Sequence, residues 1–137
     1  DDHQIVVEIP ENFPVITADE VRIEQVIANM ISNAIKYAPN GEIHITGQAR
    51  PDQIIVCVKD EGPGIAKCDL PHIFDRFYRA QETSRKTKGA GLGLYLARAI
   101  VEAHHGRMWA DPTMQKGARI CFSLPRDSED GSSEKKA

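Results

Sequence analysis

Two glycine-rich runs in this chain carry residue types that could contact a ligand. The first reads Asp-Glu-Gly-Pro-Gly-Ile at residues 60–65, and it directly follows an apolar run at residues 54–58. A carboxylate at the end of a strand can accept a hydrogen bond from a buried donor. The glycines behind it leave room for a flat group to approach the backbone. This run therefore suits a planar base.

The second run suits a different chemical group. Residues 89–94 read Gly-Ala-Gly-Leu-Gly-Leu and stand immediately ahead of a helical pattern. The first turn of a helix has unpaired N–H groups and lies at the positive end of the helix dipole, so it favours phosphates. Neither run matches the dinucleotide-binding fingerprint or the Walker pattern. Taken singly, each run could equally be a structural turn.

A third set of polar residues follows one line of a predicted helix. Asn29, Asn33 and Lys36 are spaced i, i+4 and i+7, with Tyr37 one step round, and they border the apolar stripe of that helix. Asparagine is a poor helix former, so two of them here need an explanation. One explanation is a partly buried amide pair. The other is that the amide oxygens bind a hard cation such as Mg²⁺, while the lysine contacts phosphate and the tyrosine stacks on a ring.

The elements that would position these residues include both helices and strands. Hydrophobic spacing predicts a helix that starts after an N-cap at Asp19 and ends at residues 39–41, and a second helix closed by His104-His105-Gly106. Adjacent helical side chains diverge by about 100°, so we interpret the two histidines as charges near a helix C-terminus and not as ligands of one ion. Predicted strands and extended pieces cover residues 5–9, 14–17, 42–49, 53–59, 107–110 and 118–124.

Two segments between the glycine runs allow alternative interpretations. Residues 73–79 are rich in aromatic side chains, which a small hydrophobic anchor would also explain. Residues 80–88 have no apolar periodicity and are expected to be mobile. Together with the residues from 66 onward they could form a lid over a bound ligand, although their basic side chains could simply be a solvated face.

The overall composition excludes several classes of protein. A chain of 137 residues with 41% apolar content has the size of one domain with a substantial core. A net charge of −3 gives no general reason to expect nucleic-acid binding. No apolar stretch is long enough to span a membrane, and the polar N-terminus has no signal-peptide pattern. A cytoplasmic location is therefore expected, with a full-length protein that could still be membrane-anchored. The polar residues 126–137 are expected to be a disordered tail.

The three cysteines point to a reducing compartment. Cys57, Cys68 and Cys121 form no C-x-x-C pair, and the first and last lie inside apolar runs. The sequence therefore predicts buried free thiols and not a zinc site.

The order of these motifs resembles a known family. An Asn-bearing helix, Asp-x-Gly-x-Gly, an aromatic box, a variable segment and Gly-x-Gly-x-Gly-Leu before a helix occur in that order over residues 5–125. This is similar to the catalytic and ATP-binding domain of bacterial sensor histidine kinases, in the gyrase/Hsp90/histidine kinase/MutL superfamily. The resemblance implies an α/β fold, a two-layer sandwich of the Bergerat type whose mixed sheet has helices on one face. It also implies that residues 1–125 are one catalytic domain, which binds ATP and Mg²⁺.

The resemblance assigns a role to each motif. Asn29 and Asn33 would be Mg²⁺ ligands, and Lys36 and Arg79 would approach the phosphates, so the candidate catalytic residues are Asn29, Lys36 and Arg79. Asp60 would accept a hydrogen bond from the adenine amino group. The remaining candidate ATP-binding residues are Asn33, Tyr37, Gly62, Gly64, Ile65, Phe74, Phe77, Tyr78, Gly89, Gly91, Leu92, Gly93 and Leu94.

One position favours phosphoryl transfer over hydrolysis. The hydrolase branches of the superfamily carry a glutamate general base where this chain has Asn29, whose amide cannot accept a proton at neutral pH. The resemblance thus implies a protein-histidine kinase domain that acts on a histidine-bearing dimerisation domain of the same protein, ahead of a cognate response regulator. The isolated domain would be monomeric, the full protein homodimeric, and nucleic acid no partner. A sibling ATPase and a pure interaction module are the competing interpretations.

Overall fold

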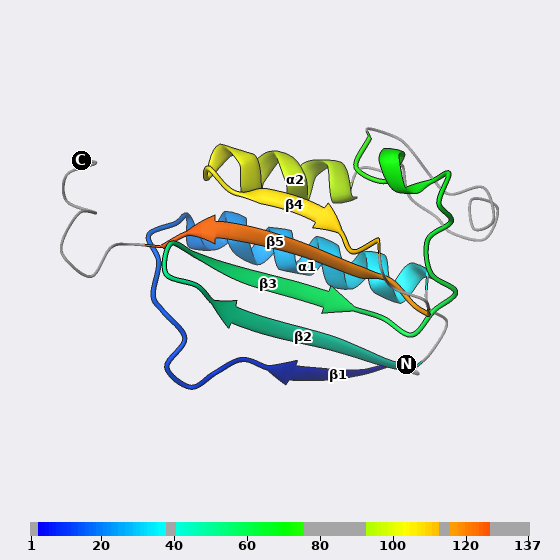
Figure 1. Cartoon of the computed structure of the whole chain (residues 1–137), viewed down its shortest axis with the longest axis horizontal. Helices are drawn as coiled ribbons and strands as arrows, with labels where there is room; N and C mark the ends of the chain where they lie inside the picture. The colour runs from blue at the N-terminus through cyan, green and yellow to red at the C-terminus, as the bar shows by residue number, and fades with distance from the viewer. Residues whose placement is uncertain (1–2, 38–40, 76–92, 113–115, 127–137) are drawn as a thin grey trace.

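The fold is an α/β sandwich of two layers, as the resemblance implies. The computed structural model describes residues 3–37, 41–75, 93–112 and 116–126. One layer is a five-stranded sheet and the other contains the two α-helices (Figure 1). The elements in chain order are β1 (His3–Glu8), α1 (Glu20–Tyr37), β2 (Gly41–Ala49), β3 (Gln53–Lys59), the short 3₁₀ helix η1 (Leu70–His72), α2 (Gly93–Ala103), β4 (Arg107–Ala110) and β5 (Arg119–Pro125).

The sheet is mixed, and its strand order differs from the chain order. The strands lie in the order β1-β2-β3-β5-β4. β1 pairs with β2 in parallel, while the other three neighbouring pairs are antiparallel. The last strand therefore lies next to the centre of the sheet, between β3 and β4. β2 and β3 form a hairpin, which confirms the strands predicted at residues 42–49 and 53–59, whereas residues 14–17 form no strand.

The hydrophobic core lies between the helices and one face of the sheet. On α1, the buried residues Val26, Met30 and Ala34 recur every four positions, as an amphipathic helix requires. The helix-facing side of the sheet and the sheet-facing side of α2 contribute the rest of the core. These residues are Ile43, Ile45, Ile54, Val56, Val58, Leu94, Ala97, Val101, Met108, Ile120, Phe122 and Leu124. Among the described residues no helix packs on the opposite face, which we call the open face and which is turned towards the viewer in Figure 1.

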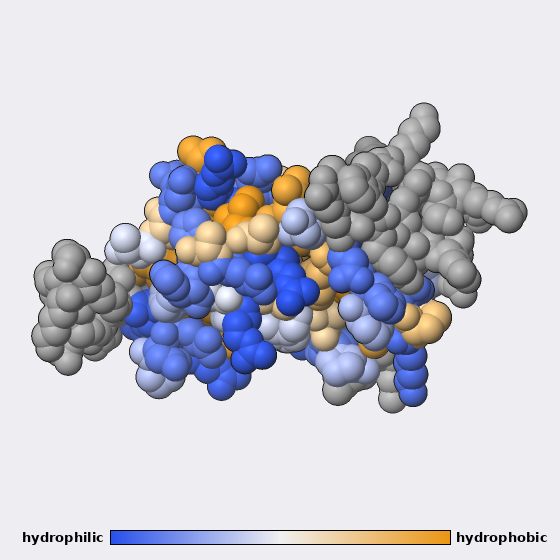
Figure 2. All heavy atoms as spheres, turned by 90° about the horizontal axis from the view of Figure 1, so that it is seen from above, coloured by the Kyte–Doolittle hydropathy of each residue, from blue (hydrophilic) through white to orange (hydrophobic). Residues whose placement is uncertain are grey.

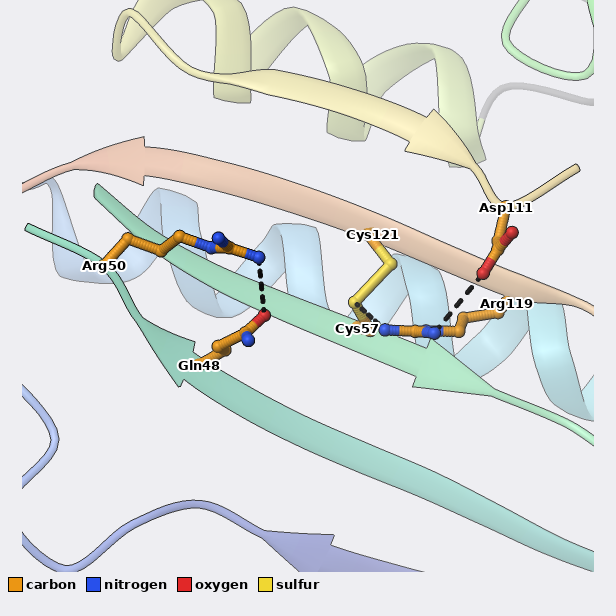
Figure 3. The surroundings of a disulfide bond; sticks show 6 residues. All are labelled: Gln48, Arg50, Cys57, Asp111, Arg119 and Cys121. Carbon is orange, nitrogen blue, oxygen red and sulfur yellow. Dashed lines mark hydrogen bonds and ion pairs between the residues drawn. A yellow bond between two sulfur atoms is a disulfide. The ribbon is translucent and has the colours of Figure 1, made fainter. Parts of the chain in front are cut away.

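Two cysteines on the open face correct the prediction of free thiols. Cys57 on β3 and Cys121 on β5 are direct partners in the antiparallel ladder, with their Cα atoms 4.0 Å apart. They form a disulfide bond (Figure 3). The sequence could not indicate this pairing, because the two residues are 64 positions apart and only the register of the sheet brings them together. Cys68 is a free cysteine and is exposed.

A histidine joins the C-terminal end of α2 to the N-terminal end of α1. The N-cap prediction is confirmed, since Asp19 Oδ1 accepts the N–H of Arg22 at 3.2 Å. His104, just past α2, lies with Nε2 3.1 Å from the backbone N of Asp19 and Nδ1 2.9 Å from the carbonyl oxygen of Ile100. The amide can only donate and the carbonyl can only accept, so this imidazole is neutral with its proton on Nδ1. The prediction that it acts as a charge at the helix end is therefore wrong for His104.

The chain leaves α2 through a left-handed residue. His105 has φ of 68°, and the N–H groups of His105 and Gly106 donate to the carbonyls of Glu102 and Val101. This pair of bonds is the Schellman arrangement that ends many helices. A Cβ at Gly106 would collide with the carbonyl oxygen of Ser123, so only glycine allows α2 to turn back onto the sheet here.

The edge of the molecule that carries α2 shows apolar patches among polar side chains (Figure 2), and Tyr95 and Leu96 of α2 are exposed.

Candidate functional site

Asp60 lies immediately after β3, where the first glycine-rich run begins. Its side chain is 6% exposed. The Oδ1 atom accepts two backbone N–H groups, from Gly62 at 2.9 Å and from Ala118 at 3.2 Å. In the part of the chain that the structure describes, no group hydrogen-bonds Oδ2. One oxygen is thus held by the backbone, and the other is available to an external donor.

Close backbone packing fixes the position of this carboxylate. Gly117 has φ of 75°, and a Cβ on it would collide with the carbonyl oxygen of Asp60. Gly64 has φ of 88°, and its Cβ would stand 3.1 Å from the carbonyl oxygen of Gly117. The backbone N–H of Asp60 also donates to the carbonyl oxygen of Ala118 at 2.9 Å. The run after β3 and the chain before β5 therefore form one tight unit around Asp60.

Burial controls the protonation of Asp60. It raises the pKa of the Asp60 carboxyl above its ordinary value, because the ionised form loses solvation. The backbone N–H groups of Gly62 and Ala118 and the charge of Lys59 oppose this rise. A buried carboxylate whose second oxygen has no hydrogen-bond partner among the described residues fits a ligand that brings a donor, such as the amino group of a base.

The asparagine line of α1 reaches the start of α2. Asn29 donates from Nδ2 to the carbonyl oxygen of Gly93 at 3.2 Å. Since that carbonyl can only accept, the amide orientation is fixed, and Oδ1 makes no hydrogen bond within the described residues. Asn33 is half-buried and Lys36 is exposed. The helical line therefore offers an amide oxygen of the kind that Mg²⁺ takes, beside the first residue of α2.

The other predicted site residues divide between described and undescribed parts of the chain. Ile65 and Phe74 are partly buried against the core, and the Arg98 guanidinium carbon lies 5.5 Å from the centre of the Phe74 ring. Leu94 is buried in the core. The side chain of Tyr37 lies outside the description, as do six whole residues and the predicted mobile segment 80–88; the six are Phe77, Tyr78, Arg79, Gly89, Gly91 and Leu92. The predicted tail is undescribed from residue 127 onward.

The described elements of the site meet at one end of the sandwich. The carboxyl end of β3, the C-terminal half of α1 and the N-terminus of α2 all lie at the right of Figure 1. Sequence reasoning missed Gly117 and Ala118, which hold Asp60 from the segment directly before β5. The available signal was the glycine directly ahead of the last predicted strand.

Among the described His, Cys, Asp and Glu side chains, one group has ligand atoms close enough to share a metal ion. Glu42, His44 and Glu61 each offer an atom within 4.8 Å of the others. His44 Nε2 is 2.8 Å from Glu42 Oε1, and the backbone N–H of Glu42 donates to Glu61 Oε1 at 3.1 Å. These contacts account for their proximity. The hydrogen bond to Glu42 is also the main cause of the raised pKa of His44.

The comparisons with known proteins agree on one family. Residues 18–128 match the family described as histidine kinase-, DNA gyrase B-, and HSP90-like ATPase. The chain is 42% identical over 126 residues to the sensor histidine kinase WalK of Bacillus subtilis, covering 88% of this chain and 20% of that protein. It is 42% identical over 123 residues to the adaptive-response sensory kinase SasA of a Synechocystis strain, covering 88% of this chain and 32% of that protein.

Solved structures give the same result. The catalytic domain of histidine kinase ThkA superposes with a TM-score of 0.77 at 31% identity, over 91% of this chain and 81% of that one. Full-length ShkA in complex with AMPPNP superposes with a TM-score of 0.78 at 30% identity, over 90% of this chain and 26% of that one.

The chain belongs to the histidine kinase-, DNA gyrase B- and HSP90-like ATPase family. Within that family it has the fold of a sensor histidine kinase catalytic domain, as its motifs predicted. It spans only about a fifth to a third of the length of these two curated relatives. None of the helices in the described residues has the length and apolar character needed to cross a membrane.

Proposed function

We propose that this chain is the phosphoryl-donating domain of a two-component sensor kinase and that it binds Mg-ATP at the Asp60 end of the sandwich. The observation that carries the proposal is the Asp60 carboxylate, with Oδ1 held by the N–H groups of Gly62 and Ala118 and Oδ2 free of described partners. The adenine amino group would donate to Oδ2. Gly62 and Gly64 would leave room for the ring beside the backbone.

The phosphates would extend from the base towards the start of α2. Unpaired N–H groups at that N-terminus favour anionic oxygens, and Lys36 would add a positive charge from α1. Asn29 and Asn33 are the residues that would hold Mg²⁺, which would neutralise charge on the phosphate oxygens. Arg79, outside the described residues, would contact the γ-phosphate.

The reaction would be transfer of the γ-phosphoryl group to a histidine on a dimerisation domain. The bond between the γ-phosphorus and the β,γ-bridging oxygen breaks, a phosphorus–nitrogen bond to the imidazole forms, and ADP leaves. The imidazole proton passes to a base on the acceptor domain, because the Asn29 amide cannot take it. This domain would contribute position and electrostatic stabilisation, which dominate phosphoryl-transfer catalysis. The phosphohistidine would then serve a cognate response regulator.

A transfer assay tests this proposal. The chain is incubated with γ-labelled Mg-ATP and the histidine-bearing dimerisation domain of its own parent protein, and label on that domain is measured against label released as phosphate. We expect labelled histidine, and little phosphate release when the acceptor is omitted. Sustained phosphate release with no labelled acceptor would reject the kinase and favour the ATPase branch of the family.

A further inference from the structure

A hollow lies on the open face of the sheet, away from Asp60. It has a volume of about 300 Å³ and is lined by Gln53, Arg107, Trp109 and Ser123. β3 starts at Gln53 and ends next to Asp60, so the hollow and Asp60 are at opposite ends of the same strand. The neighbours Ile54, Met108, Phe122 and Leu124 face the helices, so the alternation of strand side chains places the four lining residues on the other face. The volume lies at the lower end of the range for small-molecule sites.

The floor of the hollow is a buried hydroxyl. Ser123 is 4% exposed, and its hydroxyl makes no hydrogen bond with any group in the described part of the chain. Leaving such a buried hydroxyl without a hydrogen bond is unfavourable. The small serine stands opposite Arg107 in the ladder and diagonal to Trp109, so the larger side chains form walls around it. An unpartnered buried hydroxyl on the floor of a walled hollow points to a polar ligand.

The walls supply hydrogen-bond donors and an aromatic surface. The Arg107 guanidinium forms no ion pair with a described residue, and it carries only donors. The Trp109 ring nitrogen and the Gln53 amide add donors, and the indole adds a flat apolar face. Arg50 and Arg126 lie at the same end of the sheet, where Arg126 Nη1 donates to the carbonyl oxygen of Arg50 at 2.8 Å. The acidic Asp52 lies in the same turn, so the preference for an anion rests on the Arg107 guanidinium and the other donors of the walls.

We propose that this hollow binds a small aromatic anion, a single ring that carries a carboxylate or a phosphate. Arg107 pairs with the anionic group, the ring lies against the Trp109 indole, and the Ser123 hydroxyl donates to an oxygen of the ligand. The site is separate from the Asp60 end in both face and position. Its occupation does not require a nucleotide.

The only tryptophan of the chain makes this site directly observable. We would titrate the full chain with benzoate, phenyl phosphate, inorganic phosphate and benzyl alcohol, and follow the fluorescence of Trp109. Saturable binding of benzoate or phenyl phosphate is expected, at least tenfold tighter than binding of either partial probe. The better of the two aromatic anions identifies the preferred group. If inorganic phosphate binds as tightly as benzoate and phenyl phosphate, the aromatic part of the proposal is wrong. If benzyl alcohol binds as tightly as these two aromatic anions, the anionic part is wrong.

Variants separate the site from non-specific binding. Arg107→Gln should weaken binding of the better probe at least tenfold, and Ser123→Ala several-fold, with unfolding curves recorded to show that each variant is folded. Arg22→Gln, which removes an exposed arginine on α1, is the matched control and should bind as the wild type does. Asp60→Asn should also leave aryl-anion binding unchanged, so the two sites can fail independently. If no probe saturates, or if Arg107→Gln binds as well as wild type, the hollow is not an anion site.

Discussion

The two faces of the central strands are buried by different means. On the helix side, β3 and β5 present aliphatic residues and Phe122 to α1 and α2, and all of them pack without polar contacts. On the open face the same strands carry the Cys57–Cys121 disulfide, with Arg119 across it (Figure 3). Arg119 lies 3.3 Å from Asp111 Oδ2 and 3.6 Å from Cys57 Sγ. Burial on this face relies on a covalent bond and on a long polar side chain.

This difference separates two sources of stability. The helix-facing layer gains its free energy from apolar area removed from water, which is non-directional. The open face has no second layer among the described residues, so its contacts are covalent or directional. The four predictions below test this contrast, from the largest expected effect to the smallest.

Truncating the core on the helix side should have the largest effect. Phe122 is 1% exposed, and Phe122→Ala should lower the free energy of unfolding by about 3–5 kcal/mol, through lost burial and the cavity left behind. Urea unfolding measures this change in the free energy of unfolding, provided that its dependence on urea concentration is the same in both proteins. Trp109→Ala is the matched aromatic truncation on the open face, and it should cost clearly less because that side chain is only partly buried. Equal costs would contradict the contrast between the faces.

Opening the disulfide should be the next largest effect. The bond joins residues 64 positions apart, and its loss should destabilise the chain by about 2–4 kcal/mol. We expect a reductant to lower the thermal midpoint of the wild type and to leave a Cys57→Ser, Cys121→Ser double variant unchanged. Cys68→Ser should retain the full response to reductant. A wild-type midpoint that is insensitive to reductant would show that the bond does not contribute.

Asp60→Asn should separate binding from stability. The amide NH₂ group that replaces Oδ2 places a donor against the adenine amino group, which is also a donor. Calorimetry should therefore show an ATP binding free energy weakened by about 1–3 kcal/mol. Folding should not suffer at neutral pH, because burial raises the pKa of the native carboxyl and its ionised form is disfavoured. A raised native pKa means that wild-type stability declines as the pH rises from the unfolded pKa through the native one. The variant should lack that decline, and unchanged ATP affinity would remove Asp60 from the site.

The smallest expected effect concerns a polar contact on the open face. The hydrogen bond to Glu42 raises the pKa of His44 above 6.5, with smaller help from Glu8. Its stabilisation should be complete below the unfolded pKa and be lost as the pH rises through the raised value. An NMR titration of His44 measures the midpoint, and Glu42→Gln should lower it. A midpoint that does not move would assign the shift to another cause.

The sequence predicted the parts of the fold that depend on local patterns. The four-residue spacing of Val26, Met30 and Ala34 located α1, and the cap at Asp19 located its start. Local patterns could not reveal contacts between residues far apart in the sequence, which depend on strand register or on how the helices pack. The disulfide and the neutral His104 are of this kind, and both contradict the sequence-based interpretation.

The candidate site divides in the same way. The strand end and glycine pattern indicated Asp60, Gly62 and Gly64, and the helical spacing indicated Asn29 and Asn33. Ala118 was not found, because it reaches Asp60 only through the pairing of β3 with β5. The roles of all these residues, and of Tyr37, Arg79 and the second glycine run, remain predictions. Of the second run, the structure describes only Gly93 and Leu94.

The position of β5 sets the order in which this domain can be completed. The strand synthesised last lies between β3 and β4, and it pairs residues 53–59 with residues 119–125. Such distant pairing carries a loop-closure cost and slows folding. A fragment that ends before Arg119 would leave β3 with an exposed edge, which favours aggregation. Most of β5 would then be needed before Asp60 is held in place, so the proposed nucleotide site would form only after β5 has paired with β3.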